Sequence, residues 1–327
     1  MKHSIIDRVL QKLKRLRVQN QWPAKNLKAG IAAVRKHPGK TVLWIDLITL
    51  ALSRMAPPDQ QLVKSHKLSR NGVIFSFLGE LDAKLGEDLK AKAVDLDERS
   101  VGRLCGGVVH ELVRLKTIIQ CRDTHATGGY FADAEQVMVW QWNTVIHPMI
   151  KDLDFTCVLE LAPGHGRNTD HLRKLAKEIH LVDVNLSCVE ACRKRFGDKL
   201  EGCAFHYHVT DGKNLSMIPD SSITHVYSFD SMVHFDKLVV KDYVGEIARI
   251  LHPAGTAFLH HSNFGAFEPN SDWAHNVGTR SDMSAELMLA YAAEVGLDVA
   301  FQRLSGMADG WGMDDLDCFS ILRKPTR

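Results

Sequence analysis

The sequence lacks the features that mark several classes of protein. Its seven cysteines form neither a C-x-x-C pair nor a spaced disulfide framework, which favours a reducing compartment. The longest apolar run, residues 41–56, has only sixteen residues and contains Asp46 and Arg54, so it is too short to span a membrane. Residues 1–20 are too charged for a secretory signal and lack its cleavage site. We therefore expect a cytoplasmic protein.

No internal repeat or low-complexity segment divides the chain, so its organisation has to be inferred from composition and pattern. With 327 residues, 45% of them hydrophobic and 24% charged, it has the composition of an ordinary globular protein. Apolar residues recur at helical spacing through most of the first 110 residues. We predict a mostly helical N-terminal region of unknown role over residues 1–125 and a second domain over residues 126–327.

The N-terminal end is strongly basic. Residues 1–40 contain eleven Lys or Arg and one acidic residue, Asp7, which gives +10 there and leaves −8 for the rest of a chain whose net charge is +2. The sequence of residues 1–20 predicts a basic amphipathic helix, which could bind an anionic membrane surface or a nucleic acid. The same pattern is equally typical of a helix whose charged face is only solvated. The acidic remainder argues against nucleic acid. Our hypothesis is peripheral contact of residues 1–20 with anionic membrane.

From residue 156 onward, short β-rich runs alternate with amphipathic helices, which is typical of a parallel sheet covered on both faces. A helix over residues 134–150 is expected to precede the first strand. Ser187 and Glu190 predict a capping box at one helix start. The helices are predicted at 168–178, 186–196, 236–251 and 284–295. The strands are predicted at 156–161, 179–184, 203–209, 223–230, 256–263, 297–304 and 315–323.

The last two predicted strands have no helix between them, so we expect them to form an antiparallel hairpin at the sheet edge. The predicted fold class is therefore α/β. It is a Rossmann-like, doubly wound, seven-stranded and mainly parallel sheet with an antiparallel edge hairpin, preceded by the helical N-terminal region.

A glycine-containing loop follows the first predicted strand and leads into a helix. Residues 162–166 read Ala-Pro-Gly-His-Gly, and glycines at such a place let the backbone approach a ligand closely. A Rossmann dinucleotide site would prefer a small residue where Thr169 stands. The spacing instead puts four residues at alternate positions: Glu160, Ala162, Gly164 and Gly166.

Polar groups follow the next three parallel strands as well. Asp183 ends the second strand, where a carboxylate can accept both hydroxyl protons of a ribose, and Asp211 ends the third, where it could accept from an adenine amino group. Asp230 ends the fourth. Each acid alone could be a helix cap or a solvated turn. Four polar strand ends in succession favour a ligand site along the carboxyl edge of the sheet.

These motifs together resemble those of class I S-adenosylmethionine-dependent methyltransferases over roughly residues 130–325. The glycine loop is similar to their first motif, with Ala162 in place of a common glycine. Residues 249–255 resemble their L-x-P-G-G turn, with Ala254 in place of the first glycine. The resemblance implies that S-adenosyl-L-methionine is the cofactor. It implies these binding residues: Glu160, Ala162, Gly164, His165, Gly166, Asp183, Val184, Asp211, Gly212, Phe229 and Asp230.

More narrowly, residues 160–166, 228–234 and 260–263 resemble a bacterial subgroup of small-molecule methyltransferases that modify sugars and cell-surface glycans. This implies methylation of a small polar acceptor, in the first place a hydroxyl of a sugar or glycan precursor, and a role in polysaccharide biosynthesis. No nucleic-acid partner is expected.

Methyl transfer to a hydroxyl requires alignment of the acceptor and removal of one proton. His234, four residues after Asp230, is our first candidate for the base, and His261 on the fifth strand is the second. Since strand residues alternate between faces, either His261 or its neighbour His260 points inward. A magnesium-assisted reaction through Asp230, His261 and Asn263 is an alternative, but only one of these is a carboxylate. We predict no metal.

Other residues are expected to bind the acceptor or to cover the site. The segment before the first strand folds over the open edge in this family, so the helix over 134–150 could act as a lid. His165 is expected to shape the loop or lie close to the cofactor. The predicted substrate residues are Tyr130, Trp273, Arg280 and Trp311.

Three alternative functions were weighed. N-methylation of a small amine stays open, because the same cavity can serve both acceptors. A nucleic-acid methyltransferase is disfavoured, because residues 229–232 lack the Pro-Pro-aromatic sequence of amino-methylating enzymes and no cysteine follows a proline. A non-catalytic subunit that only binds S-adenosylmethionine also stays open.

Overall fold

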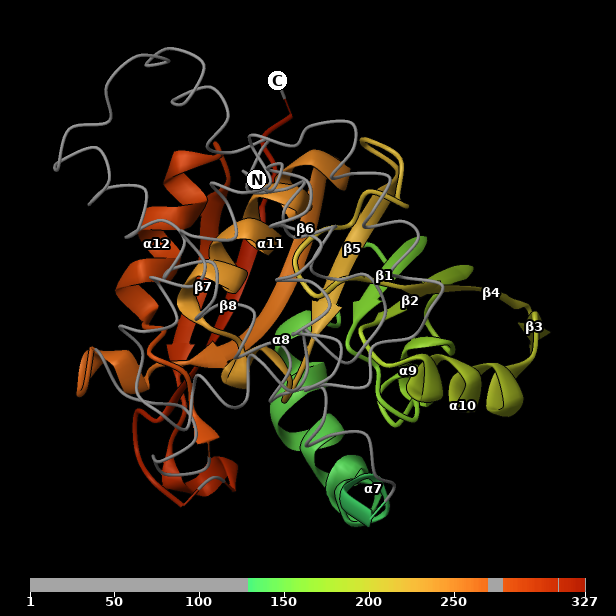
Figure 1. Ribbon diagram of the computed structural model, residues 1–327, viewed down its shortest axis with the longest axis horizontal. Coiled ribbons are helices and arrows are strands. Elements are labelled where there is room, and N and C mark those ends of the chain that lie inside the picture. Colours follow the sequence, from blue (N-terminus) through green and yellow to red (C-terminus); the bar gives the residue numbers. More distant parts are fainter. Residues whose placement is uncertain (1–128, 270–278, 311, 327) are drawn as a thin grey trace, which may run out of the picture. The chain divides into compact units, whose positions relative to one another are not determined.

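The computed structural model describes residues 129–269, 279–310 and 312–326 (Figure 1). The predictions for residues 1–125, including the basic helix and the domain boundary, lie outside the described residues. Within the described part of the chain, no helix has the length and apolar character needed to cross a membrane.

The described part begins with a continuous helical segment made of α7 (Gly129–Gln141), a π-helical turn η1 (Trp142–Ile146) and α8 (His147–Ile150). It starts five residues before the predicted position. Its inner side is apolar, since Met138, Trp142, Ile146 and Ile150 are all buried. The segment therefore packs on the core instead of standing free as a lid.

Eight strands form one sheet in the order β3-β4-β2-β1-β5-β6-β8-β7. The parallel centre runs from β4 to β6, with β1 between β2 and β5. The strand order reverses beside β1, and this is where open α/β sheets bind ligands, at the carboxyl ends of the strands (Figure 1). The strands are β1 (Cys157–Leu161), β2 (Glu178–Asp183), β3 (Lys199–Leu200), β4 (Cys203–Val209), β5 (Ile223–Ser228), β6 (Leu251–Ser262), β7 (Asp298–Leu304) and β8 (Asp317–Arg323).

The antiparallel edge confirms the predicted hairpin. Strand β8 lies between β6 and β7 and is antiparallel to both, so the later strand of the hairpin is the inner one. The eighth strand, β3, was not predicted. It has two residues and pairs antiparallel with β4, which is too short to leave an alternating pattern in the sequence.

Four helices flank the strands: α9 (Thr169–Leu172), α10 (Leu186–Phe196), α11 (Lys237–Ile250) and α12 (Ala285–Glu294). Asp236 and Ser284 cap α11 and α12, because each side chain accepts a hydrogen bond from a first-turn N–H. The capping box predicted at Ser187 and Glu190 is wrong, because Asn185, two residues before Ser187, is the N-cap of α10 and Ser187 lies inside the helix. The predicted helix at 168–178 is reduced to the four residues of α9 and the turns that follow.

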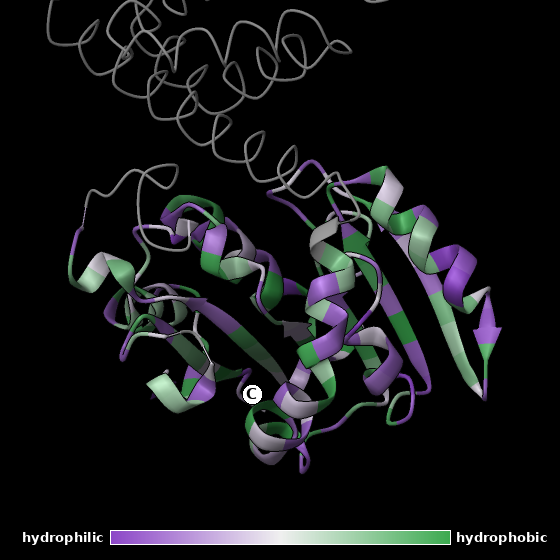
Figure 2. Cartoon of the chain, turned by 90° about the horizontal axis from the view of Figure 1, so that it is seen from below, coloured by the Kyte–Doolittle hydropathy of each residue, from purple (hydrophilic) through white to green (hydrophobic). Residues whose placement is uncertain are grey.

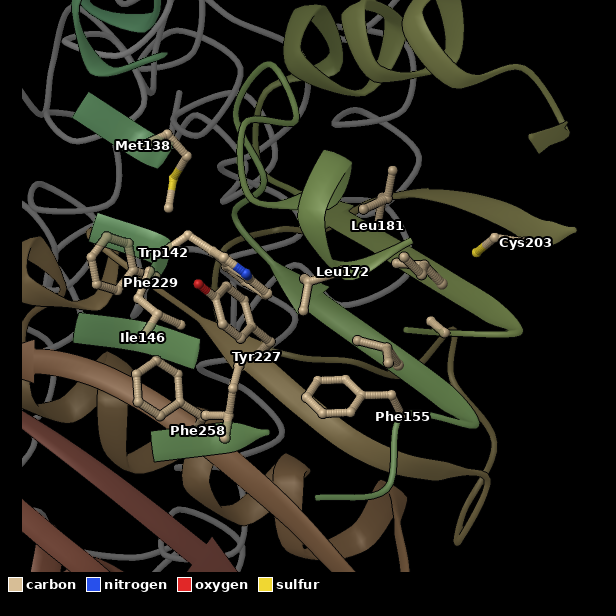
Figure 3. Close-up of a cluster of buried hydrophobic side chains, with 14 of the residues drawn as sticks. Met138, Trp142, Ile146, Phe155, Leu172, Leu181, Cys203, Tyr227, Phe229 and Phe258 are labelled. Atoms are coloured by element: carbon tan, nitrogen blue, oxygen red, sulfur yellow. The ribbon is translucent and has the colours of Figure 1, made fainter. Parts of the chain in front are cut away.

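The main core lies between the first helical segment and the sheet. Figure 3 shows Met138, Trp142 and Ile146 extending toward Tyr227 and Phe258. The rings of the last two stack with centroids 5.5 Å apart, and the Tyr227 hydroxyl donates to Asn168 at 2.9 Å. Strands and helices both carry apolar and polar residues (Figure 2), and the buried apolar residues of the core come from both. This packing fixes the first helical segment over β1 and β5.

Two glycines provide a matched test of the close backbone packing between the beginnings of β5 and β6. A Cβ at Gly255 would lie 2.8 Å from the His252 carbonyl oxygen, whereas a Cβ at Gly245, inside α11, would meet nothing within 4 Å. We expect Gly255→Ala to lower the free energy of unfolding by about 1–3 kcal/mol through overpacking. Gly245→Ala should raise it by about 0.5–1 kcal/mol through helix propensity. Urea denaturation of both variants measures the difference, and equal effects would contradict the described packing.

Candidate functional site

The loop that follows β1 is sharply bent. Ala162, Gly164 and Gly166 have φ angles of 58°, 58° and 84°. Ala162 therefore takes a left-handed conformation that costs a residue with a Cβ about 1–2 kcal/mol and that glycine would accept freely. Ala254, the other position where the family commonly has glycine, also has a positive φ of 66°. Both alanines that replace a common glycine of the family are therefore left-handed, which was not predicted from the sequence.

Both glycines of the loop face aromatic rings of neighbouring helices. A Cβ on Gly164 would lie 2.5 Å from the ring of Phe131, and one on Gly166 would lie 2.5 Å from the ring of Phe196. The ring of Phe131 also stacks on that of His165 with centroids 3.9 Å apart, and the role of His165 in shaping the loop or contacting the cofactor stays a prediction. Protein packing alone therefore requires glycine at these positions, and helix α7 lies directly against the loop.

Glu160 is buried in β1 just before the loop. One carboxylate oxygen accepts from the hydroxyl of Thr169 at 2.6 Å, while Oε1 makes no hydrogen bond to any described residue. Burial raises the pKa of Glu160 to about 7. A buried acceptor without a donor is rare in folded proteins and indicates a place for a ligand donor or a water molecule.

Asp183, at the end of β2, is the second buried carboxylate. It accepts from the backbone N–H of Gly164 at 3.2 Å and from that of Asn185 at 2.8 Å. Burial raises its pKa to about 6, against the lowering effect of these hydrogen bonds. Val184, which follows it, is partly buried. The carboxylate therefore joins the glycine loop to the next strand and keeps further acceptor capacity.

Asp211 lies in a different environment. It is exposed, and its Oδ1 accepts from the backbone N–H groups of Lys213 and Asn214 at 3.0 and 3.2 Å. The N–H of Gly212 is directed to the hydroxyl of Thr210 at 3.3 Å. The loop after β4 is thus held by its own side chains, and the adenine contact of Asp211 stays a prediction.

Asp230, after β5, forms a mostly buried ion pair that the sequence did not reveal. Its Oδ2 lies 2.6 Å from Nη2 of Arg167, and its own φ is 56°. Burial by itself would raise the pKa of Asp230, but the charge of Arg167 outweighs this effect and lowers the pKa to about 2. Arg167 also donates to the carbonyl of Ala134 in α7. A strained residue held by a charged partner is common at functional sites.

The two adjacent histidines of β6 face opposite sides of the sheet. His260 accepts the backbone N–H of Asp230 on Nδ1 at 3.1 Å, and its Nε2 lies 3.4 Å from Asp317. Its ring lies 4.8 Å from that of Phe229 and 4.6 Å from that of Phe319. The inward histidine at the carboxyl edge is therefore His260, which sequence reasoning considered but did not choose.

His261, the second predicted base, is fully buried. Its Nδ1 bonds the carbonyl of Ser262 and its Nε2 bonds the hydroxyl of Ser320, both at 2.9 Å. Burial lowers its pKa to about 4. With both ring nitrogens engaged in the core, His261 is not placed to accept a proton from a substrate, which argues against its predicted role.

His234, the first predicted base, ends the short helix η2 (Met232–His234) and is buried. Its Nδ1 is 2.8 Å from the carbonyl oxygen of Thr279, so it carries the proton and donates. In the neutral ring the lone pair then resides on Nε2. The N–H of Ser281 bonds the carbonyl of Val233 and fixes the same segment. The imidazole is therefore oriented with a basic nitrogen of known identity.

Of the four predicted substrate residues, the structure describes the side chain of one, Arg280. Arg280 is buried and forms a two-point ion pair with Asp317, at 2.8 and 2.7 Å. This pairing argues against its predicted contact with the acceptor. Tyr130 lies in the first turn of α7, but its side chain is outside the described residues, as are Trp273 and Trp311. Phe229 is buried beside His260.

The ion pair gives a prediction that separates structure from substrate binding. Arg280→Gln leaves a buried carboxylate without its charge partner, so we expect a loss of about 3–5 kcal/mol of unfolding free energy. The partly exposed pair of Arg303 and Asp309 is the control, and Arg303→Gln should cost about 1 kcal/mol or less. Denaturant titration measures both. An Arg280 variant of normal stability with impaired acceptor binding would restore the substrate role.

The segment that forms this geometry matches a known protein family. Residues 158–255 match the family Methyltransf_25, described as a methyltransferase domain. The matched part runs from β1 to the beginning of β6 and contains the glycine loop and all four strand ends. This part of the chain is similar to a methyltransferase domain.

Solved structures with a similar fold are S-adenosylmethionine-dependent methyltransferases by description. One is from Mesorhizobium loti (12% identity, 56% of this chain and 98% of that chain, TM-score 0.46). Others are from Clostridium acetobutylicum (14%, 60% and 98%, 0.46) and Methanosarcina mazei (14%, 55% and 98%, 0.44). With TM-scores below 0.5, these similarities add nothing to the assignment of a function. A comparison with curated proteins gave no match.

Proposed function

We propose that this domain binds S-adenosyl-L-methionine and transfers its methyl group to a hydroxyl of a small polar acceptor, in the first place a sugar or glycan precursor. The observation that carries the proposal is the pair of buried carboxylates, Glu160 and Asp183, on either side of a bent loop at the carboxyl edge of the sheet. They lie in the segment that matches a methyltransferase domain.

The residues present fit this cofactor. Asp183 can accept hydrogen bonds from the two ribose hydroxyls, because each of its oxygens has a lone pair beyond the one engaged by a backbone N–H. The unsatisfied Oε1 of Glu160 is a second buried acceptor for the cofactor's donor groups. When bound, S-adenosylmethionine supplies a methyl group attached to a positively charged sulfur, which is a good leaving group because it departs as a neutral thioether.

The chain itself has to position the acceptor and accept a proton. His234 suits proton removal, because the hydrogen bond to Thr279 leaves its Nε2 as the basic atom. Arg167 and Asp230 fix the backbone between the glycine loop and η2. A rigid sheet edge of this kind accelerates the reaction mainly by holding the acceptor in line with the methyl group. Such alignment supplies most of the rate increase in methyl transfer.

The sequence resemblance to sugar-modifying enzymes supports a hydroxyl acceptor. N-methylation of a small amine uses the same base and is the competing outcome. Purified protein given cofactor with a labelled methyl group and a small-molecule fraction of cell extract should yield a labelled product. An ether-linked methyl on a sugar supports the proposal, whereas a labelled amine replaces it by N-methylation.

The proposed cofactor site predicts the effect of replacing Asp183. Asp183→Asn removes charge-assisted hydrogen bonds, so affinity for S-adenosylhomocysteine should fall by at least ~10-fold. Because the pKa of Asp183 is about 6, its carboxylate becomes protonated in more acid solution and then accepts fewer hydrogen bonds. Affinity in the native protein should therefore fall as the pH drops below about 6 and be constant above it. Isothermal calorimetry measures both effects.

Asp211→Asn is the matched comparison, because Asp211 is exposed and bound to its own loop. It should weaken binding less than Asp183→Asn does. Unchanged affinity in a folded Asp183→Asn variant would remove the basis for the cofactor assignment.

Replacing His234 tests the proposed base. His234→Gln should leave cofactor affinity unchanged and lower turnover by about 10² to 10⁴-fold, the usual contribution of a positioned base. The native rate should rise with pH as the imidazole becomes neutral. His252→Gln, at an exposed position of β6, serves as the control and should keep full activity. A His234→Gln turnover within twofold of native, with chemistry limiting, would exclude this base.

Peripheral membrane contact through residues 1–20 stays a separate proposal, supported by their basic amphipathic pattern. Full-length protein should float with anionic but not neutral vesicles, and salt should weaken the binding. Equal recovery of a chain shortened by these residues would end the idea.

A further inference from the structure

Strand pairing gathers five possible metal ligands on one face of the sheet, away from the carboxyl edge. Cys157 and Glu178 are paired at the first positions of β1 and β2. His180 is paired with His206, and Val182 with His208. Paired residues of neighbouring strands share a face, as do alternate residues of one strand. The shared face therefore presents these side chains: Cys157, Glu178, His180, His206 and His208.

The donor atoms of these side chains are close together. One donor atom each from Cys157, Glu178 and His180 lies within 4.8 Å of the others. Nε2 of His206 is 3.5 Å from a carboxylate oxygen of Glu178, and its ring stacks on that of His180 at 4.5 Å. Nδ1 of His180 is 3.1 Å from Nε2 of His208. Three of these contacts involve His180: its proximity to Cys157 and Glu178, its stacking on His206 and its hydrogen bond with His208.

The cluster can be reached from solvent. Glu178 and His206 are each almost half exposed, while Cys157 is buried beneath them. The opposite face of the same strands holds apolar residues of the core, such as Ile179 and Leu181. Three histidines beside a carboxylate and a thiol are not required by that core.

We propose that Cys157, Glu178, His180 and His206 bind one zinc-like divalent metal ion at this face. A thiolate, imidazoles and a carboxylate form a donor set that zinc accepts and that magnesium and calcium do not favour. Ligand atoms around tetrahedral zinc are about 3.5 Å apart, given its usual bond lengths. The donors therefore have to close in by about 1 Å, which rotation of side chains can supply. His208 is then a neighbour that orients His180.

Metal binding requires the thiolate form of Cys157 and neutral imidazoles. The metal–sulfur bond forms as the thiol proton passes to solvent, so binding should release about one proton per ion.

The site lies at the amino ends of β1 and β2, whereas the candidate methyl-transfer site lies at their carboxyl ends. The ion would join β1, β2 and β4 and stabilise the sheet without contacting the acceptor. The proposal therefore does not depend on the proposed methyltransferase activity.

The test uses the full chain, stripped of metal with EDTA and titrated with Co²⁺ at neutral pH. We expect one tight equivalent with a sulfur-to-cobalt charge-transfer band, displacement by Zn²⁺ but not by Mg²⁺, a higher melting temperature and release of about one proton. Cys157→Ser and His180→Gln should each weaken binding at least tenfold. Cys203→Ser, a buried cysteine on the other face of β4, and His252→Gln are the matched controls and should bind normally.

Two results would overturn the proposal. One is a native chain that binds no ion tightly. The other is a Cys157→Ser variant with the same charge-transfer band and affinity, because the ion would then be bound elsewhere in the chain. If Cys157→Ser fails to fold, judged by circular dichroism, Glu178→Gln and His180→Gln decide the question, since both keep the size of the native side chain.

Discussion

The ion pair between Arg167 and Asp230 is the interaction on which the carboxyl edge depends. Arg167 follows the glycine loop directly, and Asp230 follows β5 in a left-handed conformation. The same guanidinium bonds the backbone of α7, and the backbone N–H of Asp230 bonds His260. Four segments thus meet around one mostly buried pair. Removing either charge would leave the other buried and uncompensated, which is costly.

The pair begins a longer polar network. From His260 it continues to Asp317 on β8 and from there to Arg280, which precedes α12. Acceptors and donors alternate along this path, so each charged group is neutralised by a neighbour. A polar network inside a sheet edge gives the edge a single arrangement. This rigidity is what a reaction that depends on alignment needs.

Sequence patterns predicted the fold well, because strand and helix periodicity and the position of glycines are local properties. The strand ends at Asp183 and Asp230 followed from the pattern of strands and helices, whereas the positive φ angles of Ala162 and Ala254 were not predicted. The π-helical turn and β3 were not predicted either, since neither leaves a periodic signal. The choice between His260 and His261 depended on the facing of one strand, and a shift by one residue reverses it.

Pairs distant in sequence were not predictable in the same way. Arg167 and Asp230 are 63 residues apart, and Arg280 and Asp317 are 37 apart. The chain has 39 acidic residues, so composition does not select the partner of either arginine. The histidine cluster was missed for a related reason, because it exists only in the parallel register of β2 with β4.

The place of β8 has a consequence for the order in which the domain can be completed. Among the described strands, β7 pairs only with β8, and β8 is the strand that joins it to the rest of the sheet. During synthesis β7 leaves the ribosome first, and its partner in the native sheet is absent until β8 follows. Arg280 and His260 likewise wait for the carboxylate of Asp317. The nascent domain therefore exposes the unfinished edge of β6 until β8 is made, and this is the interval in which a chaperone would have a surface to bind.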